Sequence, residues 1–354
     1  MDKQQLVLHI KSEAHRLGFN HCGIALALPI PHIDAYMDWT QSGYHAGMAY
    51  LAREDTVAKR QDPGLIVEGC QSVISLALLY NPPIKNHNQI DLGFGRISSY
   101  AVTTDYHSVI RDKLSQLESS IHRAAGEHIR LKSYVDTGPV LERSYATLSG
   151  IGMVGKNSCL IIQGEGSCFF LAEILTDLAL PPDPPFTRDI CGSCTRCIDA
   201  CPTSCILPNR TINAGDCISY LTIEHKGAIP DELKHFIGSW VFGCDICQMV
   251  CPHNARAVST PRELGEPLVS NPVDLVELFS MTQEAFSGFY GHTPLSRAKR
   301  HGLLRNAAIV LGNQQYHQAL PLLKQALVEE TDPGVLDACR WAIEQLTSSS
   351  TRMK

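Results

Sequence analysis

Long hydrophobic runs are absent from this sequence of 354 residues. The longest, Ser72–Tyr80, is about half as long as a helix must be to span a bilayer. The N-terminal residues, MDKQQLVLHIKSEAH, contain neither the basic start nor the apolar centre of a secretory signal. We therefore expect a cytoplasmic protein that has no contact with a membrane.

Excess positive charge is also absent, because 30 Lys and Arg residues stand against 36 Asp and Glu, for a net charge of -6. This balance argues against a protein that coats nucleic acid indiscriminately. Hydrophobic residues make up 44% of the chain, which is enough to form cores, and the length corresponds to roughly two or three domains. The composition indicates a soluble globular enzyme or carrier.

Cysteine, in contrast, is abundant: nine of its 14 residues lie between Cys191 and Cys251. Cytosolic proteins rarely contain structural disulfides, so the spacing of these cysteines is more informative than their number. The other five stand singly in apolar surroundings, where we expect buried packing residues. They are Cys22, Cys70, Cys159, Cys168 and Cys339.

The first part of the chain alternates between helical and extended patterns. Helical periodicity over Leu6–Leu17 and Val109–Ala125 ends each time at a glycine, and extended segments follow. Two β-like runs, Cys159–Gln163 and Cys168–Leu175, are separated by a Gly-Glu-Gly turn that predicts a hairpin. These patterns predict an α/β domain over residues 1–180, large enough to hold a big ligand.

Two proline-rich zones divide the rest of the chain. Pro181–Pro185 is a stiff boundary, so residues 181–260 form a separate cysteine-rich domain. A turn-rich zone at Pro252–Pro272 closes that domain, and helical periodicity dominates residues 261–354. Short paired helices there are similar to HEAT-type repeats. The sequence thus predicts an α+β multidomain fold of three parts.

Two cysteine runs have the spacing of bacterial ferredoxins. The first is Cys-x2-Cys-x2-Cys-x3-Cys-Pro from Cys191, the pattern that holds a [4Fe–4S] cluster, and the second is a partial copy from Cys244. In such pairs the last cysteine of a run binds the neighbouring cluster, and Cys205 is left spare. We assign one cluster to Cys191, Cys194, Cys197 and Cys251, and the other to Cys201, Cys217, Cys244 and Cys247.

A pair of four-cysteine zinc sites is the structural alternative, although zinc does not require three evenly spaced thiolates followed by Cys-Pro. Two clusters indicate the transfer of single electrons, either by a carrier or by a reductase that uses the electrons itself. A carrier needs only the cysteine region. A domain's length of chain lies on either side of that region, which favours the reductase.

Further motifs surround the cysteine runs, and with them the whole chain resembles epoxyqueuosine reductases. The resemblance implies a cobalamin enzyme that reduces epoxyqueuosine to queuosine at the wobble position of tRNA, the last step in making queuosine. It also implies kinship with reductive dehalogenases, so a corrinoid-dependent reductase of small molecules is the alternative. The motifs are VDTGPVLER at 135–143, GMVGKN at 152–157 and RAKRHGLLRNAA at 297–308, with KRQDP at 59–63, DYH at 105–107, CISYLTIE at 217–224 and WVFGCD at 240–245.

The chemistry implied by the resemblance needs an acid. Removal of an epoxide oxygen as water consumes two electrons and two protons, and an alkoxide is a poor leaving group. Asp136 ends a predicted strand before a Gly-Pro turn, and burial beside a corrin would keep it protonated. We therefore expect Asp136 to be the catalytic acid. Taken without the resemblance, it could equally cap the following turn.

The resemblance also implies the residues that hold the corrinoid. No Asp-x-His-x-x-Gly signature occurs, so a cobalt-ligating histidine is not expected. The glycine-rich turn Gly152–Asn157 would let backbone amides approach the polar edge of the corrin, although it could be an ordinary turn. Tyr106 and His107 could equally start a helix and pack on the core. The expected set is Arg60, Tyr106, His107, Asp136, Lys156, Asn157, Ser158, Ser219 and Asp245.

Positive charge is concentrated at one place in the helical tail. Residues 290–313 contain four cations and no acid, a pattern that predicts phosphate contacts with tRNA. A solvated surface is the alternative, and Gly302 could separate a basic turn from the following helix. The expected partners are a tRNA that carries epoxyqueuosine and an unidentified electron donor, and the protein is expected to be a monomer. The four cations are Arg297, Lys299, Arg300 and Arg305.

Overall fold

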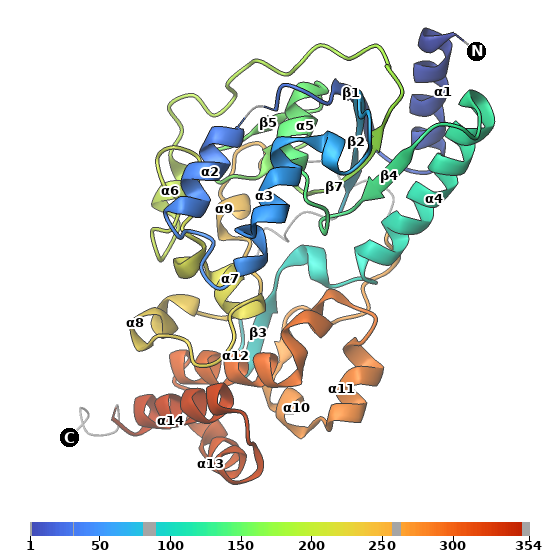
Figure 1. Ribbon diagram of the computed structural model, residues 1–354. Coiled ribbons are helices and arrows are strands. Elements are labelled where there is room, and N and C mark those ends of the chain that lie inside the picture. Colours follow the sequence, from blue (N-terminus) through green and yellow to red (C-terminus); the bar gives the residue numbers. More distant parts are fainter. Residues whose placement is uncertain (1, 31, 81–89, 257–262, 349–354) are drawn as a thin grey trace.

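The computed structural model describes residues 2–30, 32–80, 90–256 and 263–348. Figure 1 shows a part built on a β-sheet, which contains most of the N-terminal half, above a group of helices formed by the C-terminal end. Among the helices of these ranges, none combines the length and the apolar character needed to cross a bilayer.

The larger part is organised around a four-stranded sheet. Its second and third strands in spatial order, β2 and β7, are eight residues long, and β2 is buried along its whole length, as the apolar run at Ser72–Tyr80 requires. Every neighbouring pair is antiparallel. The mixed α/β organisation is thereby confirmed. The spatial order is β1 (His21–Leu26), β2 (Ser72–Leu79), β7 (Phe169–Thr176) and β4 (Leu131–Tyr134).

Helices cover both faces of this sheet (Figure 1). On one face lie α1 (Lys3–Arg16) and α4 (Tyr106–Ala125), the two helices expected from periodicity, which share a core with alternate residues of β2 and β7. Gly18 follows α1 with a φ of +93°, a conformation that favours glycine. On the other face, α5 (Glu142–Leu148) packs against β1, β2 and β7.

Two more helices and a small hairpin extend this part of the molecule. The helices are α2 (Ile33–Gln41) and α3 (Glu54–Gln61), and the hairpin joins β5 (Met153–Val154) to β6 (Leu160–Ile161).

We expected residues 159–163 and 168–175 to pair with each other in a hairpin, and this prediction is wrong. The turn itself forms, with a bridge between Ile162 and Gly166, but β6 pairs with β5 while β7 pairs with β2 and β4. The physical reason is that β7 gains the long, fully buried strand β2 on one side and the shorter β4 on the other. A local hairpin would have left one of those sides open.

A second sheet joins distant parts of the chain. Its central strand, β3 (Phe94–Ile97), pairs in parallel with β8 (Trp240–Phe242) and antiparallel with β9 (Val273–Asp274). One continuous core includes Ile97, residues of the cysteine region and the C-terminal helices. The three expected ranges therefore share a sheet and a core, and their division into separate domains stays a prediction. Its boundary at 260/261 lies outside the described residues, as does Pro261 of the turn-rich zone.

The cysteine region contains short helices between irregular segments. The proline-rich boundary forms no helix or strand, as expected. The two short helices that follow Cys194 and Cys244 pack against each other. The helices are α6 (Arg196–Asp199), α7 (Ile218–Ile223), α8 (Asp231–Lys234) and α9 (Ile246–Met249).

The C-terminal end is helical, as expected. The most extensive packing between its helices joins α12 to α14, and α13 also packs on α14. Gly302 lies inside α12 and does not separate a basic turn from it, which corrects that interpretation. The HEAT-like repeat stays a prediction. The helices are α10 (Leu275–Ser280), α11 (Gln283–Tyr290), α12 (Lys299–Asn313), α13 (Leu320–Glu329) and α14 (Pro333–Ser348).

Candidate active site

A cavity of about 1200 Å³ lies between the larger sheet and the cysteine region. This volume exceeds the roughly 300–1,000 Å³ typical of sites for drug-sized ligands. The wall is rich in aromatic side chains, and cationic and hydroxyl groups lie between them. The cavity therefore suits a large ligand with a flat apolar body and a polar rim. The aromatic residues include Tyr36, Trp39, Tyr100, Tyr106, Phe169 and Phe170.

Asp136 lies on the cavity wall, and its role as the catalytic acid stays a prediction. Its backbone φ of +58° is uncommon for a residue with a side chain, although aspartate tolerates it better than most. The hydroxyl of Tyr106 donates a hydrogen bond of 2.7 Å to Asp136 Oδ2, and His107 Nε2 lies 3.7 Å from the same oxygen. The carboxyl side chain is 56% exposed, so it can meet a ligand in the cavity.

Tyr106 is held in place by the first turn of α4. Its ring stacks on Phe170 of β7 with centroids 4.0 Å apart. Burial and the charge of Asp136 raise the pKa of Tyr106 far above its ordinary value, so the side chain remains a neutral phenol. Tyr106 is therefore a hydrogen-bond donor to Asp136 at any physiological pH.

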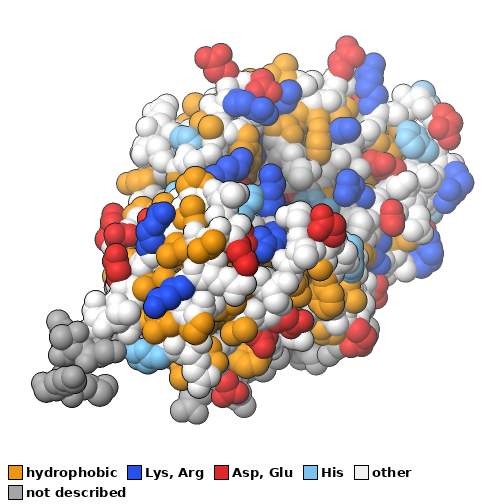
Figure 2. Space-filling model, turned by 90° about the horizontal axis from the view of Figure 1, so that it is seen from below, with side chains coloured by type: hydrophobic (Ala, Val, Ile, Leu, Met, Phe, Trp, Pro, Cys, Tyr) orange, Lys and Arg blue, Asp and Glu red, His pale blue; other side chains and the backbone are white. Residues whose placement is uncertain are grey.

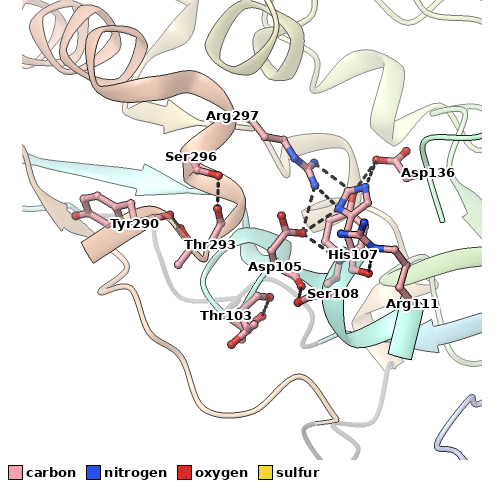
Figure 3. A network of polar contacts seen from close by, with 12 residues as sticks. Thr103, Asp105, His107, Ser108, Arg111, Asp136, Tyr290, Thr293, Ser296 and Arg297 are labelled. Atoms are coloured by element: carbon pink, nitrogen blue, oxygen red, sulfur yellow. Dashed lines mark hydrogen bonds and ion pairs between the residues drawn. The ribbon is translucent and has the colours of Figure 1, made fainter. Parts of the chain in front are cut away.

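Arg297 connects the C-terminal helices to this site. Figure 3 shows it reaching from the segment before α12 towards Asp105 and His107. Its Nη2 lies 2.5 Å from His107 Nδ1 and 3.4 Å from Asp105 Oδ1, and its guanidinium lies over the Tyr106 ring, 5.1 Å from the centroid. Burial raises the pKa of Asp105, but hydrogen bonds from His107 and the Arg297 charge outweigh it and leave that pKa lowered. Arg297, which we expected to contact the phosphates of tRNA, thus lies in the cavity wall.

Three further expected residues line the cavity. Arg60 is buried and donates a hydrogen bond of 2.8 Å to the Tyr36 hydroxyl, while its Nε meets no partner within the described residues. Ser158, with a φ of +61°, and Ser219 add hydroxyl groups to the wall. The unpaired Arg60 Nε can donate a hydrogen bond to the polar rim of a ligand, whereas the Ser158 hydroxyl donates to the Arg210 carbonyl and can only accept one.

The other three expected cofactor residues lie outside the cavity wall. Lys156 Nζ donates to the carbonyls of Gly192, at 2.7 Å, and Cys194, at 2.9 Å, and so holds the first cysteine loop. Asn157 accepts a hydrogen bond from the backbone of Cys159. Asp245 is buried and accepts hydrogen bonds from Ser98 and from the backbone of Ser99. Lys156 and Asp245 thus have structural partners, whereas Asn157 Nδ2 is buried and meets no partner within the described residues. Their contacts with a cofactor stay a prediction.

The cysteine runs lie next to two hollows. Cys217 lines the large cavity, whereas Cys191 and Cys194 line a second hollow of about 690 Å³, which opens at the surface beside Arg188 and Arg196. No three His, Cys, Asp or Glu side chains in the described residues meet as a single metal ion requires. The division of the eight cysteines between two clusters therefore stays a prediction from their spacing.

Two cysteines outside the assigned set contact members of it. The Sγ atom of Cys205 lies 3.4 Å from that of Cys201, and its thiol also bonds to Cys217. Cys159, which we expected to be a lone packing residue, shares a hydrogen bond with Cys247. The lone-residue interpretation of Cys159 is therefore wrong, because the β5–β6 hairpin brings it to the cysteine region.

The remaining C-terminal cations do not form a basic surface patch. Arg300 makes a two-point ion pair with Glu330, at 2.7 and 3.0 Å. Arg305 is 3% exposed, and its guanidinium donates to the carbonyls of Leu221, His225 and Gly227. The expected phosphate contact is therefore wrong for Arg305. Lys299 is exposed, and on the face shown in Figure 2 basic side chains are interspersed with acidic ones.

Two acids were not expected from the sequence. Glu142, at the start of α5, is partly exposed and lines the cavity, while Glu173 lies in the middle of β7 with no exposed surface. A lone acid in the otherwise apolar strand FFLAEILT was a signal for Glu173. Glu142 lies inside the motif at 135–143.

A double-cluster cysteine region beside a large cavity defines an iron–sulfur oxidoreductase. Two family models match the chain and agree with this class. One, described as a 4Fe-4S double cluster binding domain, matches residues 190–254. The other, described as Epoxyqueuosine reductase QueG, DUF1730, matches residues 60–137.

Curated epoxyqueuosine reductases are similar over most of the chain. The protein from Cyclobacterium marinum is 42% identical, with 85% of this chain and 95% of that protein aligned. The one from Pseudomonas aeruginosa is 37% identical, and the alignment covers 97% of this chain and 95% of that protein. The chain therefore belongs to the epoxyqueuosine reductase family.

Solved structures of this family superpose on the whole fold. An epoxyqueuosine reductase from Bacillus subtilis, whose catalytic aspartate loop is swung out of the active site, gives a TM-score of 0.88 at 31% identity and covers 98% of this chain and 91% of its own. Another, with an epoxyqueuosine-modified tRNA stem loop, gives a TM-score of 0.85 at 30% identity, covering 98% of this chain and 100% of its own.

Proposed function

We propose that this protein reduces the epoxide of epoxyqueuosine, at the wobble position of tRNA, to the cyclopentene of queuosine. One observation carries the proposal: Asp136 and the predicted cluster ligand Cys217 lie on the wall of the same large cavity. A proton donor and an electron source thus face one space, in a chain that belongs to this family. The relative with a modified tRNA stem loop supports tRNA as the substrate.

The two hollows suggest the direction of electron flow. The surface hollow exposes the loop of Cys191 and Cys194, so an external donor would reduce that cluster first. Cys217 lies at the cavity, so the second cluster would deliver single electrons to the ligand there.

The cavity fits cobalamin by its volume, its aromatic wall and its unpaired Arg60 donor. We propose that Arg60, Ser158 and Ser219 hold the polar edge of the corrin. Bound cobalamin would supply strongly reducing cobalt chemistry that acts on the epoxide.

Asp136 would protonate the oxygen that leaves the epoxide. Two C–O bonds break and one C=C bond forms, and the oxygen departs as water with two electrons and two protons. The Tyr106 hydroxyl orients the Asp136 carboxyl, while Arg297 fixes Tyr106 and His107 from the other side. The aspartate loop reported for the Bacillus subtilis relative would correspond to the turn that contains Asp136.

The proposal is tested by nucleoside mass spectrometry of tRNA from a deletion strain. The wild-type gene should restore queuosine, whereas Asp136→Asn should lower turnover by about 100-fold or more, so that the epoxide accumulates. The purified variant should retain its iron, sulfide and cobalamin. Asp112→Asn, exposed on α4, is the matched control and should restore queuosine. Full activity of Asp136→Asn would contradict the assignment.

A further inference from the structure

Two exposed arginines lie beside the first cysteine loop, at the surface hollow. Arg188 precedes the loop, and Arg196, the first residue of α6, follows Cys194 closely. Both arginines line the hollow, and neither guanidinium has a hydrogen-bond or ion-pair partner within the described residues. Their charges therefore remain available to a molecule that covers the hollow.

The acid beside these arginines is engaged by other groups. Asp189 is the acid among the described residues that line the hollow. Its Oδ2 accepts a hydrogen bond of 2.8 Å from Arg210 Nη2, and its Oδ1 accepts from the backbone of Cys191 and Gly192. Asp189 thus holds the loop and is already paired with a cation.

The balance of charge around the loop is positive. Lys156 lies behind the loop and donates to two of its carbonyls, so its charge meets no acid there. Asp199 in α6 accepts a hydrogen bond from the Thr195 hydroxyl. We call this region the loop surface, and in it the cations outnumber the acids although the whole protein has a net charge of -6. The cations are Arg188, Arg196, Lys156 and Arg210, and the acids are Asp189 and Asp199.

A partner seated here would respond to these local charges. At an ionic strength of about 0.15 M the Debye length is about 8 Å, so acids elsewhere on the protein are largely screened. The cover over the predicted cluster is thin, because Gly192 and Ser193 are exposed and the ligands Cys191 and Cys194 are partly exposed. Among the described residues, the hollow and the large cavity share no lining residue, so donor and substrate can be bound together.

We propose that the loop surface docks a small acidic protein that carries single electrons. This proposal rests on the proposed function, which assigns a cluster to this loop. Carboxylates around the redox group of the partner pair with Arg188 and Arg196. One electron then passes to the cluster, so the partner is oxidised and the cluster is reduced, and no bond is made or broken. Electron-transfer interfaces of this kind are small, so the complex is short-lived.

The rate of cluster reduction tests the docking without turnover. The probe is a reduced [2Fe–2S] ferredoxin with a strongly acidic surface, mixed anaerobically with the oxidised holoenzyme and followed by stopped-flow absorbance. The double variant Arg188→Glu, Arg196→Glu should be reduced at least about tenfold more slowly than wild type at about 0.1 M salt. At about 1 M salt screening should bring the two rates within about threefold. Equal rates at low salt would overturn the proposal.

Lys324→Glu, Arg340→Glu is the matched control. It reverses two exposed cations on α13 and α14 and therefore gives the same net charge. Its rate should stay within about twofold of wild type. An equal loss of rate in both double variants would show that net charge decides the rate, which would refute the loop surface. Iron and sulfide contents, and complete reduction by excess dithionite, should match wild type in both variants.

An RNA is the other polyanion that the loop surface could bind. If the Arg188→Glu, Arg196→Glu variant binds a tRNA anticodon stem loop about tenfold more weakly and the ferredoxin reduces it at the wild-type rate, the surface is an RNA site and the proposal is wrong.

Failure of the proposed function gives a different result. With excess dithionite as the electron source, the Arg188→Glu, Arg196→Glu variant should reduce epoxyqueuosine in tRNA as wild type does, because dithionite needs no docking surface. If the wild type itself leaves epoxyqueuosine unchanged, the proposed function fails. The difference in cluster reduction between wild type and variant still decides whether the loop surface docks an acidic carrier.

Discussion

Arg305 illustrates how burial changes the role that a sequence suggests for a cation. Its guanidinium donates to one backbone carbonyl in α7 and to two in the segment between α7 and α8, and Asn306 accepts two further hydrogen bonds from it. Such a network holds a loop of the cysteine region against α12. The basic cluster in the sequence therefore contains at least one structural residue.

Replacing Arg305 should test this structural role. Arg305→Leu leaves three carbonyls without donors, so we expect it to lower the free energy of unfolding by about 3 kcal/mol or more. Lys299→Leu, an exposed change two turns earlier in α12, should alter it by less than about 0.5 kcal/mol. Denaturant unfolding measures both. Equal stabilities of the two variants would contradict the structural role.

The sequence located much of the cavity wall, including the acid Asp136, but it did not single out Glu142. Arg60, Tyr106, Asp136 and Ser219 lie within motifs that mark the family, and all of them line the cavity. The burial of Glu173 without a hydrogen-bond partner in the described residues could not be predicted, because it depends on β2, β4 and α5, which the chain brings together from distant positions.

At the scale of elements, Lys156 links the β5–β6 hairpin to the first cysteine loop. Its two hydrogen bonds to the carbonyls of Gly192 and Cys194 restrain the backbone that carries two predicted ligands. A change that removes the ammonium group should loosen this loop and leave the cavity intact.

Lys156→Met is the corresponding experiment. We expect faster loss of iron to a chelator, by about threefold or more, because the loss of two charge-assisted hydrogen bonds weakens the loop. Cobalamin content should be unchanged. Lys132→Met, on β4, is the control. Iron loss at the wild-type rate would show that the loop does not depend on Lys156.

Local patterns predicted the long helices because α1 and α4 bury one regularly spaced face each. The pairing of the strands was harder to predict. The turn at residues 164–166 has the composition of a hairpin, but the partner of β7 is decided by burial across the whole sheet.

The whole molecule is held together by the core that β3 shares with the C-terminal helices. The expected division at residue 260 would cut this core and remove β9 from the second sheet. Ile97, Val241 and Phe242, all buried, would then lose their covering residues. Sequence patterns alone could not reveal the shared core. Changes in composition along the chain show where segments begin and end, but not which segments contact each other.

A truncation experiment tests the shared core. Residues 1–260 expressed alone should be insoluble or should lack a cooperative thermal transition, because buried apolar surface becomes exposed. Co-expression with residues 261–354 should restore solubility. Cooperative unfolding of the shorter fragment by itself would show that the N-terminal ranges form an independent domain.

The position of β3 also affects how the chain is made. Both of its partner strands lie much later in the sequence, so β3 leaves the ribosome long before β8 and β9 exist. During synthesis its backbone groups have no native strand with which to pair. The second sheet can therefore form only after residues 240–274 have been translated, so its assembly is one of the last steps in the folding of a newly made chain.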